Sequence, residues 1–282
     1  MKTKCLLFAA LLLALAACKG NRIPAMDQQL IADMQTIRTA RIFLGHQSVG
    51  RNLLDGIAAL AEEAGQPLTY VSPRAARGQS AFFAESLIGN NGDPAGKCDA
   101  FAGEIGKLEG EIDLALLKLC YADFHAETGV EAVLDHYVST LAALESRYPS
   151  AVFIPVTAPL QAASPRWKSA LKDLMNRREP SREANLKRCR FNDLLRQRYR
   201  GKPIFDLAAV ESTGPRGERA TFTLAGQTGF SLLRVYTADG GHLNERGSRI
   251  AGRELLRTLA AAVRERQSAF RAAMPGSRED IL

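Results

Sequence analysis

The sequence lacks the motifs of structural zinc sites and of P-loop nucleotide enzymes. None of the five cysteines stands in a C-x-x-C pair, the arrangement that zinc ribbons use. No glycine-rich G-x-x-x-x-G-K-[ST] loop is present to cradle phosphate groups. The single tryptophan and an aromatic content of 7% offer no stacking platform. We therefore expect no cofactor and no bound metal.

The overall composition is that of a globular protein. Of the 282 residues, 46% are hydrophobic and 24% are charged, which excludes a disordered chain or a low-complexity fibre. The length allows one large domain or two small ones. The pattern of apolar segments shows neither an internal repeat nor a second domain, so one domain is expected.

Residues 1–17 have the form of an export signal. Two lysines precede an apolar run that is too short to span a bilayer comfortably as a helix. The run ends in Leu-Ala-Ala-Cys, which resembles a bacterial lipobox, so Cys18 is expected to carry a lipid that anchors the chain to a membrane. Lys19 follows, and by resemblance to Gram-negative lipoproteins this predicts the outer membrane, facing the periplasm. The alternative is an ordinary cleaved secretory peptide.

Export would place the remaining cysteines in a compartment that permits disulfides. Cys98, Cys120 and Cys189 are three in number, so at most one internal pair can form among them. The sequence does not select a pair, and buried free thiols are at least an equal expectation.

Strand and helix signals alternate along the chain after a tether and N-terminal helix at 18–40. This alternation predicts an α/β fold, a three-layer doubly wound (flavodoxin-like) parallel sheet of about five strands, over residues 41–265. A tail at 266–282 follows, and residues 211–236 are expected to add a hairpin over the carboxyl edge, with arms at 221–224 and 232–236. The expected strands are 41–45, 68–71, 112–117, 151–156 and 203–206, and the clearest helices are 26–39, 130–148 and 245–264.

A serine follows the first expected strand. In an open parallel sheet, ligands bind at the carboxyl ends of the strands. Ser48 lies on the turn from strand to helix, which places its hydroxyl and its backbone N–H at that edge, near a helix N-terminus that favours negative charge. The alternative is that Ser48 only caps the helix, a position that serine prefers.

An aspartate and a histidine lie in a glycine-containing loop before the last helix. Asp239 and His242 are three residues apart, so the carboxylate can accept from one imidazole nitrogen and fix the tautomer of the ring. The other nitrogen is then available to take a proton from a hydroxyl group. The alternative is an ordinary surface histidine.

Together these segments resemble the SGNH (GDSL-like) hydrolase family. The carriers of the resemblance are Ser48 after the first strand and the Asp-x-x-His of Asp239 and His242 before the last helix, in the chain order Ser, Asp, His. The resemblance covers residues 40–262, and segments 157–159, 190–192 and 205–207 also look like the framework of that family. It implies that Ser48 is the nucleophile, that His242 is the general base and then acid, and that Asp239 orients the imidazole.

The first block departs from the family pattern. The family usually has Gly-Asp-Ser, whereas this chain has Gly-His-Gln-Ser at 45–48, with one more residue before the serine. The extra residue could shift the nucleophile or bring His46 beside it.

The third block departs as well, because the segment 118–123 lacks the asparagine that donates to the oxyanion in the family. Asn90 or Asn91, in the Gly-Asn-Asn-Gly loop that begins at Gly89, could supply the missing donor, and Lys118 could stabilise negative charge instead. The alternatives are that this loop is a simple turn and that the site is degenerate and binds without turnover.

Two other arrangements of the same residues remain open. Cys120 could act as a thiol nucleophile together with His242. By ligand type, His46, His242 and Asp239 could also hold a metal ion.

A basic segment is inserted at 164–202 and is expected to be helical. Residues 166–202 contain thirteen Lys or Arg and four Asp or Glu, a net charge of +9, which exceeds the +7 of the whole chain. Such a segment is either a solvated basic face or a contact surface for an anionic polymer or lipid headgroups. No nucleic-acid partner is expected for an exported protein, and the sequence leaves the oligomeric state open.

These features predict an exported lipoprotein serine hydrolase that cleaves a carboxylic ester. Candidate substrates are O-acetyl groups on envelope or extracellular polysaccharide, or small acyl esters. The alternatives are a non-catalytic binding or scaffold lipoprotein on the same fold, and a polysaccharide O-acyltransferase that uses the same three residues.

Overall fold

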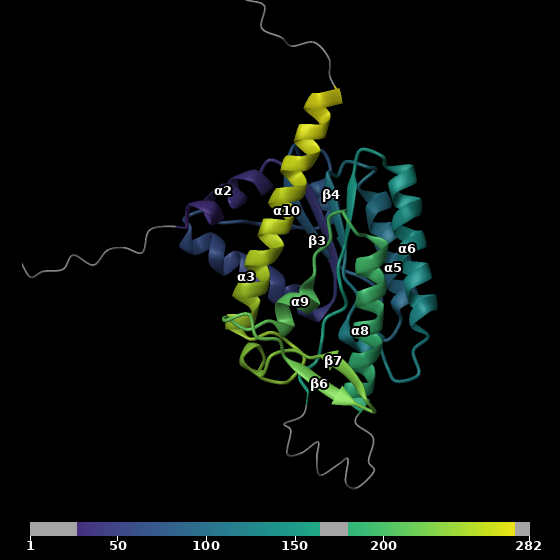
Figure 1. Ribbon diagram of the computed structural model, residues 1–282. Coiled ribbons are helices and arrows are strands. Elements are labelled where there is room, and N and C mark those ends of the chain that lie inside the picture. The colour runs from purple at the N-terminus through teal and green to yellow at the C-terminus, as the bar shows by residue number, and fades with distance from the viewer. Residues whose placement is uncertain (1–26, 164–179, 274–282) are drawn as a thin grey trace, which may run out of the picture.

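The computed structural model describes residues 27–163 and 180–273, which form a sheet covered by helices on both faces (Figure 1). The sheet has five strands in the order β2-β3-β1-β4-β5, and all neighbouring strands run parallel. The carboxyl ends of the strands therefore share one edge, and the predicted fold class is confirmed. The strands are β1 (Arg41–His46), β2 (Tyr70–Val71), β3 (Phe82–Leu87), β4 (Leu114–Leu117) and β5 (Val152–Pro155).

Successive strand residues point to opposite faces of the sheet and build two cores. In β4, Leu114 and Leu116 belong to one core, and Ala115 and Leu117 belong to the other. The first core is covered by α2 (Gln28–Ile37), α3 (Ser48–Glu63), α9 (Leu207–Ser212) and α10 (Glu245–Ala273). The second core is covered by α4 (Pro73–Ala76), α5 (Pro94–Lys107), α6 (Val130–Arg147) and α8 (Pro180–Arg198).

Two strand predictions were wrong. The structure forms β3 at Phe82–Leu87, where no strand was expected. This strand was missed because the polar residue Glu85 interrupts its apolar run. In the structure, Glu85 pairs with the buried His46. The expected strand at 203–206 contributes only one parallel bridge, from Phe205 to Val156. Its last residue, Asp206, already caps α9 and so ends the extended backbone.

The hairpin is present, with a different second arm from the one expected. β6 (Thr221–Leu224) pairs antiparallel with β7 (Gln227–Phe230). Ala225 and Gly226 both have positive φ angles, which suits a two-residue hairpin turn. In Figure 1 the hairpin lies at the lower end of the sheet, beside the start of α8.

The helix predictions agree with the structure in position. Helix α6 ends at Arg147, and α10 continues to Ala273, beyond its expected end. Within the described residues, none of the helices is both long enough and apolar enough to cross a membrane. The predicted export signal at 1–17, the predicted lipidation site Cys18 and the first part of the basic insertion, 164–179, lie outside the described residues.

The three cysteines of the described chain are free thiols. Cys98 and Cys120 are buried and Cys189 is partly buried. Burial raises the pKa of the Cys98 thiol to about 12, so it stays protonated and behaves as a small apolar side chain.

Candidate active site

Asp239 and His242 form a short hydrogen bond in the loop between the 3₁₀ turn η2 (Arg234–Tyr236) and α10. The distance from His242 Nδ1 to Asp239 Oδ2 is 2.6 Å. The other carboxylate oxygen accepts from the backbone N–H groups of Gly241 and His242, each at 2.8 Å. These backbone donors and the His242 ring hold the pKa of Asp239 well below its usual range. With Nδ1 donating to an ionised carboxylate, Nε2 is the nitrogen that can accept a proton.

Ser48 is the first residue of α3, directly after β1. Gln47 rather than Ser48 occupies the N-cap position and makes no side-chain capping bond, so the capping interpretation of Ser48 was wrong. The Ser48 side chain is partly exposed, and it lies at a helix N-terminus, where backbone N–H groups and the helix dipole favour negative charge.

The structure connects the helix of Ser48 to the loop of His242. Side chains four residues apart lie on the same face of a helix, so Asn52 lies one turn beyond Ser48. The Asn52 Oδ1 accepts from the backbone N–H of Leu243 at 3.2 Å, directly after His242. The Ser48 face of α3 is therefore the face that meets the histidine loop.

Helices α3 and α10 approach closely because glycine lies at their contact. A Cβ atom on Gly56 would lie 1.9 Å from the carbonyl oxygen of Ser248, and one on Gly252 would lie 2.8 Å from the backbone nitrogen of Ile57. The relative position of the two helices, and with it that of Ser48 and His242, is set by backbone contact.

The Gly-Asn-Asn-Gly loop lies beside the turn that carries Ser48. The Gln47 side-chain amide donates to the carbonyls of Ile88 and Gly89, at 2.8 and 2.7 Å. Asn90 and Asn91 are exposed, and Asn91 Oδ1 accepts from the Lys97 ammonium at 3.1 Å. The loop thus sits where it could offer donors to an oxygen bound near Ser48.

Lys118 lies behind the turn and not on its surface. Its side chain is fully buried, and Nζ donates to the carbonyl of Gln47 at 3.4 Å. Burial lowers the pKa of Lys118 to about 8. Its contact supports the N-cap residue of α3, next to Ser48.

His46 is buried beneath the same turn. Its Nε2 lies 2.9 Å from Glu85 Oε2, its Nδ1 lies 3.1 Å from the carbonyl of Gln47, and burial lowers the pKa of the imidazole. Both ring nitrogens are thus engaged inside the protein, and the ring faces Glu85. Across residues 27–163 and 180–273, no three His, Cys, Asp or Glu side chains form a metal-binding group, so the structure does not bring His46, His242 and Asp239 together as one.

A buried ion pair joins α5 to the 3₁₀ turn η1 (Tyr121–Asp123) that follows β4. Lys97 Nζ lies 2.5 and 2.8 Å from the two carboxylate oxygens of Asp123, and both side chains are fully buried. Asp123 also accepts from the backbone N–H groups of Gly92 and Cys120, at 2.9 and 2.6 Å. Cys120 itself is 1% exposed, which keeps its thiol out of reach of a substrate in solution.

Tyr121 is a residue of the site that the sequence did not single out. Its ring stands edge-on to the His242 ring, with centroids 5.7 Å apart. A Cβ atom on Gly241 would lie 3.0 Å from Cζ of the Tyr121 ring, so any other residue there would push the ring back by a few tenths of an ångström. The consecutive glycines before His242 were the available signal that another group comes close.

We expect Gly241→Ala to lower kcat for ester hydrolysis by about 10- to 100-fold, because the added methyl group displaces Tyr121 and His242 from each other. Steady-state kinetics on p-nitrophenyl acetate would measure the effect. Gly103→Ala on α5 is the matched control, since a Cβ atom there meets no atom within 4 Å. Equal kcat values for both variants would contradict a role for this contact.

The segments that resemble the family framework join the end of β5 to α8 and α9. Asn192 on α8 bonds both the N–H and the carbonyl of Ala158, at 2.7 and 3.0 Å. Thr157 donates to Asp206 and accepts from the N–H of Ala208, which joins the end of β5 to α9.

Some of the arginines on α8 bind acceptors within the protein itself. Arg196 bonds the carboxylate of Asp206 at 2.7 and 2.8 Å. Arg188 is buried and donates to main-chain carbonyls. A contact surface for an anionic polymer would therefore rest on the other basic residues of the insertion.

No protein-family model and no curated protein matches the chain. Among solved structures, the chain is similar to a G-D-S-L family lipolytic protein from Desulfitobacterium hafniense DCB-2, with 10% identity over 78% of this chain and 99% of that one, and a TM-score of 0.44. It is also similar to the periplasmic domain of a lipopolysaccharide acetyltransferase from Salmonella ser. Paratyphi A, with 11% identity, coverage of 84% and 98%, and a TM-score of 0.45.

A third similar structure, from Streptococcus pneumonia, is described as a platelet activating factor, with 13% identity, coverage of 83% and 96%, and a TM-score of 0.46. Of these three structures, the Desulfitobacterium protein bears the G-D-S-L family name, which is the family that the residues around Ser48 and His242 resemble.

Proposed function

We propose that this chain is an exported serine hydrolase that cleaves a carboxylic ester. The observation that carries the proposal is the Asp239–His242 hydrogen bond of 2.6 Å in a loop that Asn52 ties to the helix of Ser48. An ionised carboxylate, an oriented imidazole and a serine at a helix N-terminus are the groups that acyl transfer requires.

In this proposal Ser48 Oγ attacks the acyl carbon while His242 Nε2 takes the hydroxyl proton. The tetrahedral intermediate then collapses, and the same proton passes to the leaving alcohol. Water attacks the acyl-enzyme in a second round, which releases the acid and restores Ser48. Asp239 stays ionised and stabilises the imidazolium that forms in each step.

The oxyanion of the intermediate needs donors on the opposite side of Ser48 from the histidine. We assign this role to the backbone N–H of Ser48 and to the loop of Gly89, Asn90 and Asn91, which Gln47 holds beside α3. Loss of one such donor in a hydrolase typically costs about 10²–10³-fold in kcat. Lys118 and His46 support the turn from inside.

Ser48→Ala is expected to lower kcat on p-nitrophenyl acetate by about 10⁴- to 10⁶-fold, because the covalent step is lost. Turnover would be followed by the release of p-nitrophenol, and Ser80→Ala, at an exposed serine outside the site, is the matched control. Unchanged turnover in Ser48→Ala would remove the proposed nucleophile. Formation of an acetylated alcohol in place of acetate would instead show an acyltransferase.

We also propose that Cys18 carries the lipid anchor and that the protein resides in the cell envelope. The support is the lipobox-like sequence before Cys18. Cys18→Ala should move the protein from the membrane fraction to the soluble fraction. Retention in the membrane fraction would contradict the anchor.

A further inference from the structure

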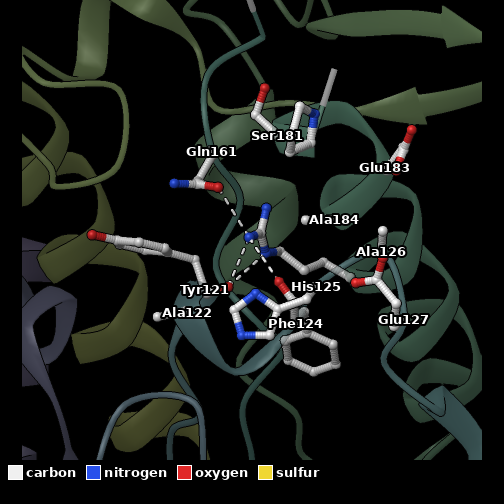
Figure 2. A pocket seen from close by; sticks show the side chains of 12 residues that line it. Tyr121, Ala122, Phe124, His125, Ala126, Glu127, Gln161, Ser181, Glu183 and Ala184 are labelled. Carbon is white, nitrogen blue, oxygen red and sulfur yellow. Dashed lines mark hydrogen bonds between the residues drawn. The ribbon is translucent and has the colours of Figure 1, made fainter. Parts of the chain in front are cut away.

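A pocket of about 520 Å³ shares Tyr121 with the candidate active site, because Tyr121 lines the pocket and its ring contacts His242. Its walls come from the segment Tyr121 to Glu127 after β4, from Gln161 after β5, and from the first turn of α8. In Figure 2, Ser181 and Glu183 lie on one side of this pocket, and Phe124 and His125 lie on the other. Its volume is within the range of about 300–1,000 Å³ typical of small-molecule sites and is far more than an acetyl group needs.

The order of the strands places this pocket on the histidine side of the nucleophile. The sheet runs β3-β1-β4, so the loop of Gly89 follows one strand, Ser48 follows the next and Tyr121 follows the third. Tyr121 both lines the pocket and stacks edge-on against His242. The acyl oxygen belongs on the Gly89 side, where donors are available, whereas the leaving alcohol must be within reach of His242, which protonates it.

The lining of the pocket is suited to hydroxyl groups. Gln161, Ser181 and His125 can both donate and accept hydrogen bonds, and the Glu183 carboxylate accepts them. An alkyl chain in the same place would bury the Ser181 hydroxyl, the His125 ring and the Glu183 carboxylate against carbon atoms, at a cost in binding free energy. The Glu183 carboxylate also opposes an anionic group, and the Arg188 guanidinium that lines the pocket is already bonded to the wall.

A buried arginine fixes the shape of the pocket. Arg188 is 1% exposed and donates to the carbonyl of Tyr121 at 3.0 and 2.7 Å and to Gln161 Oε1 at 3.0 Å. These bonds join three separate segments of the wall. The polar groups of the pocket are therefore held in place before a ligand binds, which reduces the entropy lost on binding.

We propose that this pocket binds the alcohol half of the ester and that this half is an uncharged, hydroxyl-rich group such as a sugar. The proposal rests on the proposed function and adds to it that specificity lies in the alcohol and not in the acyl group. Glu183 and Gln161 would bond the hydroxyl groups, and the chain segment from Tyr121 to Ala126 would contact the sugar ring.

The test compares two acetate esters that differ in the alcohol: 6-O-acetylglucose and n-hexyl acetate. The full-length protein should show a kcat/KM ratio that favours the sugar ester by about 10-fold or more. Ser181→Phe, which fills the pocket, and Glu183→Gln, which removes a charged acceptor, should bring the ratio close to one. Glu62→Gln, an exposed glutamate in the last turn of α3, is the matched control and should leave the ratio unchanged.

A binding measurement separates failure of this proposal from failure of the proposed function. Saturation-transfer NMR with 6-O-acetylglucose on the Ser48→Ala protein needs no turnover, and the signal should be lost when Ser181→Phe is added. A signal or a kcat/KM ratio that is unchanged by Ser181→Phe and Glu183→Gln would overturn the assignment of the pocket. Full turnover in Ser48→Ala would overturn the nucleophile alone, and the NMR result would still decide the pocket.

Discussion

Replacing Asp239 by asparagine is expected to lower kcat for ester hydrolysis by about 10⁴-fold, with little change in fold. The carboxylate accepts from His242 Nδ1 and from two backbone N–H groups. An asparagine side chain can keep one acceptor oxygen but cannot carry the negative charge that stabilises the imidazolium. It can also present an N–H to Nδ1, which would place the ring proton on Nε2, the wrong nitrogen for a general base.

The pH profile provides a second test of the same residue. The backbone bonds and His242 lower the pKa of Asp239, so the carboxylate remains ionised as the pH falls through the usual range for aspartate. The interaction that it provides is therefore present above the pKa of an unfolded aspartate and is lost only at more acidic pH. Protonation of Asp239 is consequently not expected to limit activity at mildly acidic pH.

Kinetics on p-nitrophenyl acetate between about pH 5 and pH 9 would measure both effects, with the wild type reporting the pH dependence and Asp239→Asn the loss of kcat. Asp99→Asn is the control, because Asp99 forms an exposed pair with His136 outside the site. A loss of less than about 10-fold in Asp239→Asn would mean that the pair does not act as the oriented base of the proposed reaction.

The second large effect concerns stability, at the buried pair of Lys97 and Asp123. Lys97→Met should lower the free energy of unfolding by about 3–5 kcal/mol, because it leaves the Asp123 carboxylate buried without its counter-charge. Asp123 also holds the N–H groups of Gly92 and Cys120, so both loops beside Ser48 should loosen. Activity should therefore fall together with stability.

Urea denaturation would measure the change in unfolding free energy. Lys107→Met is the matched control, since Lys107 pairs with Glu104 at the surface and its loss should cost about 0.5 kcal/mol or less. A loss in Lys97→Met no larger than in this control would show that the buried pair does not hold the two loops. Asp123→Asn should show the same pattern, because it removes the charge from the other side.

The sequence predicted the parts of the fold that are decided locally. The strands around Phe43, Leu116 and Ile154 are short apolar runs buried on both faces, and such runs are recognisable by themselves. Strand β3 was missed because a glutamate is unexpected in a buried strand. Glu85 is accommodated there because it bonds His46, which is 39 residues earlier in the chain. The expected strand at 203–206 is cut short because Asp206 caps α9. The same residues could extend the sheet or begin the helix, and the sequence pattern alone does not decide between the two.

The same division applies to the candidate site. The contact of Asp239 with His242 is local, so a spacing of three residues was enough to predict it. The contacts of Asn52 with Leu243 and of Tyr121 with His242 join segments that are far apart in the chain, and no local pattern encodes them. His46 was placed beside Ser48 by its position in the chain, whereas packing turned the ring toward Glu85.

The two halves of the site come from opposite ends of the domain, since Ser48 begins the first helix after β1 and His242 precedes α10, the last helix. During synthesis, the proposed nucleophile Ser48 therefore emerges long before the proposed base His242. The chain is therefore expected to be inactive until α10 packs against α3 at Gly56 and Gly252. If the proposed hydrolase activity is present, its appearance would report that α10 has folded into place, and a chain shortened before α10 would lack that activity.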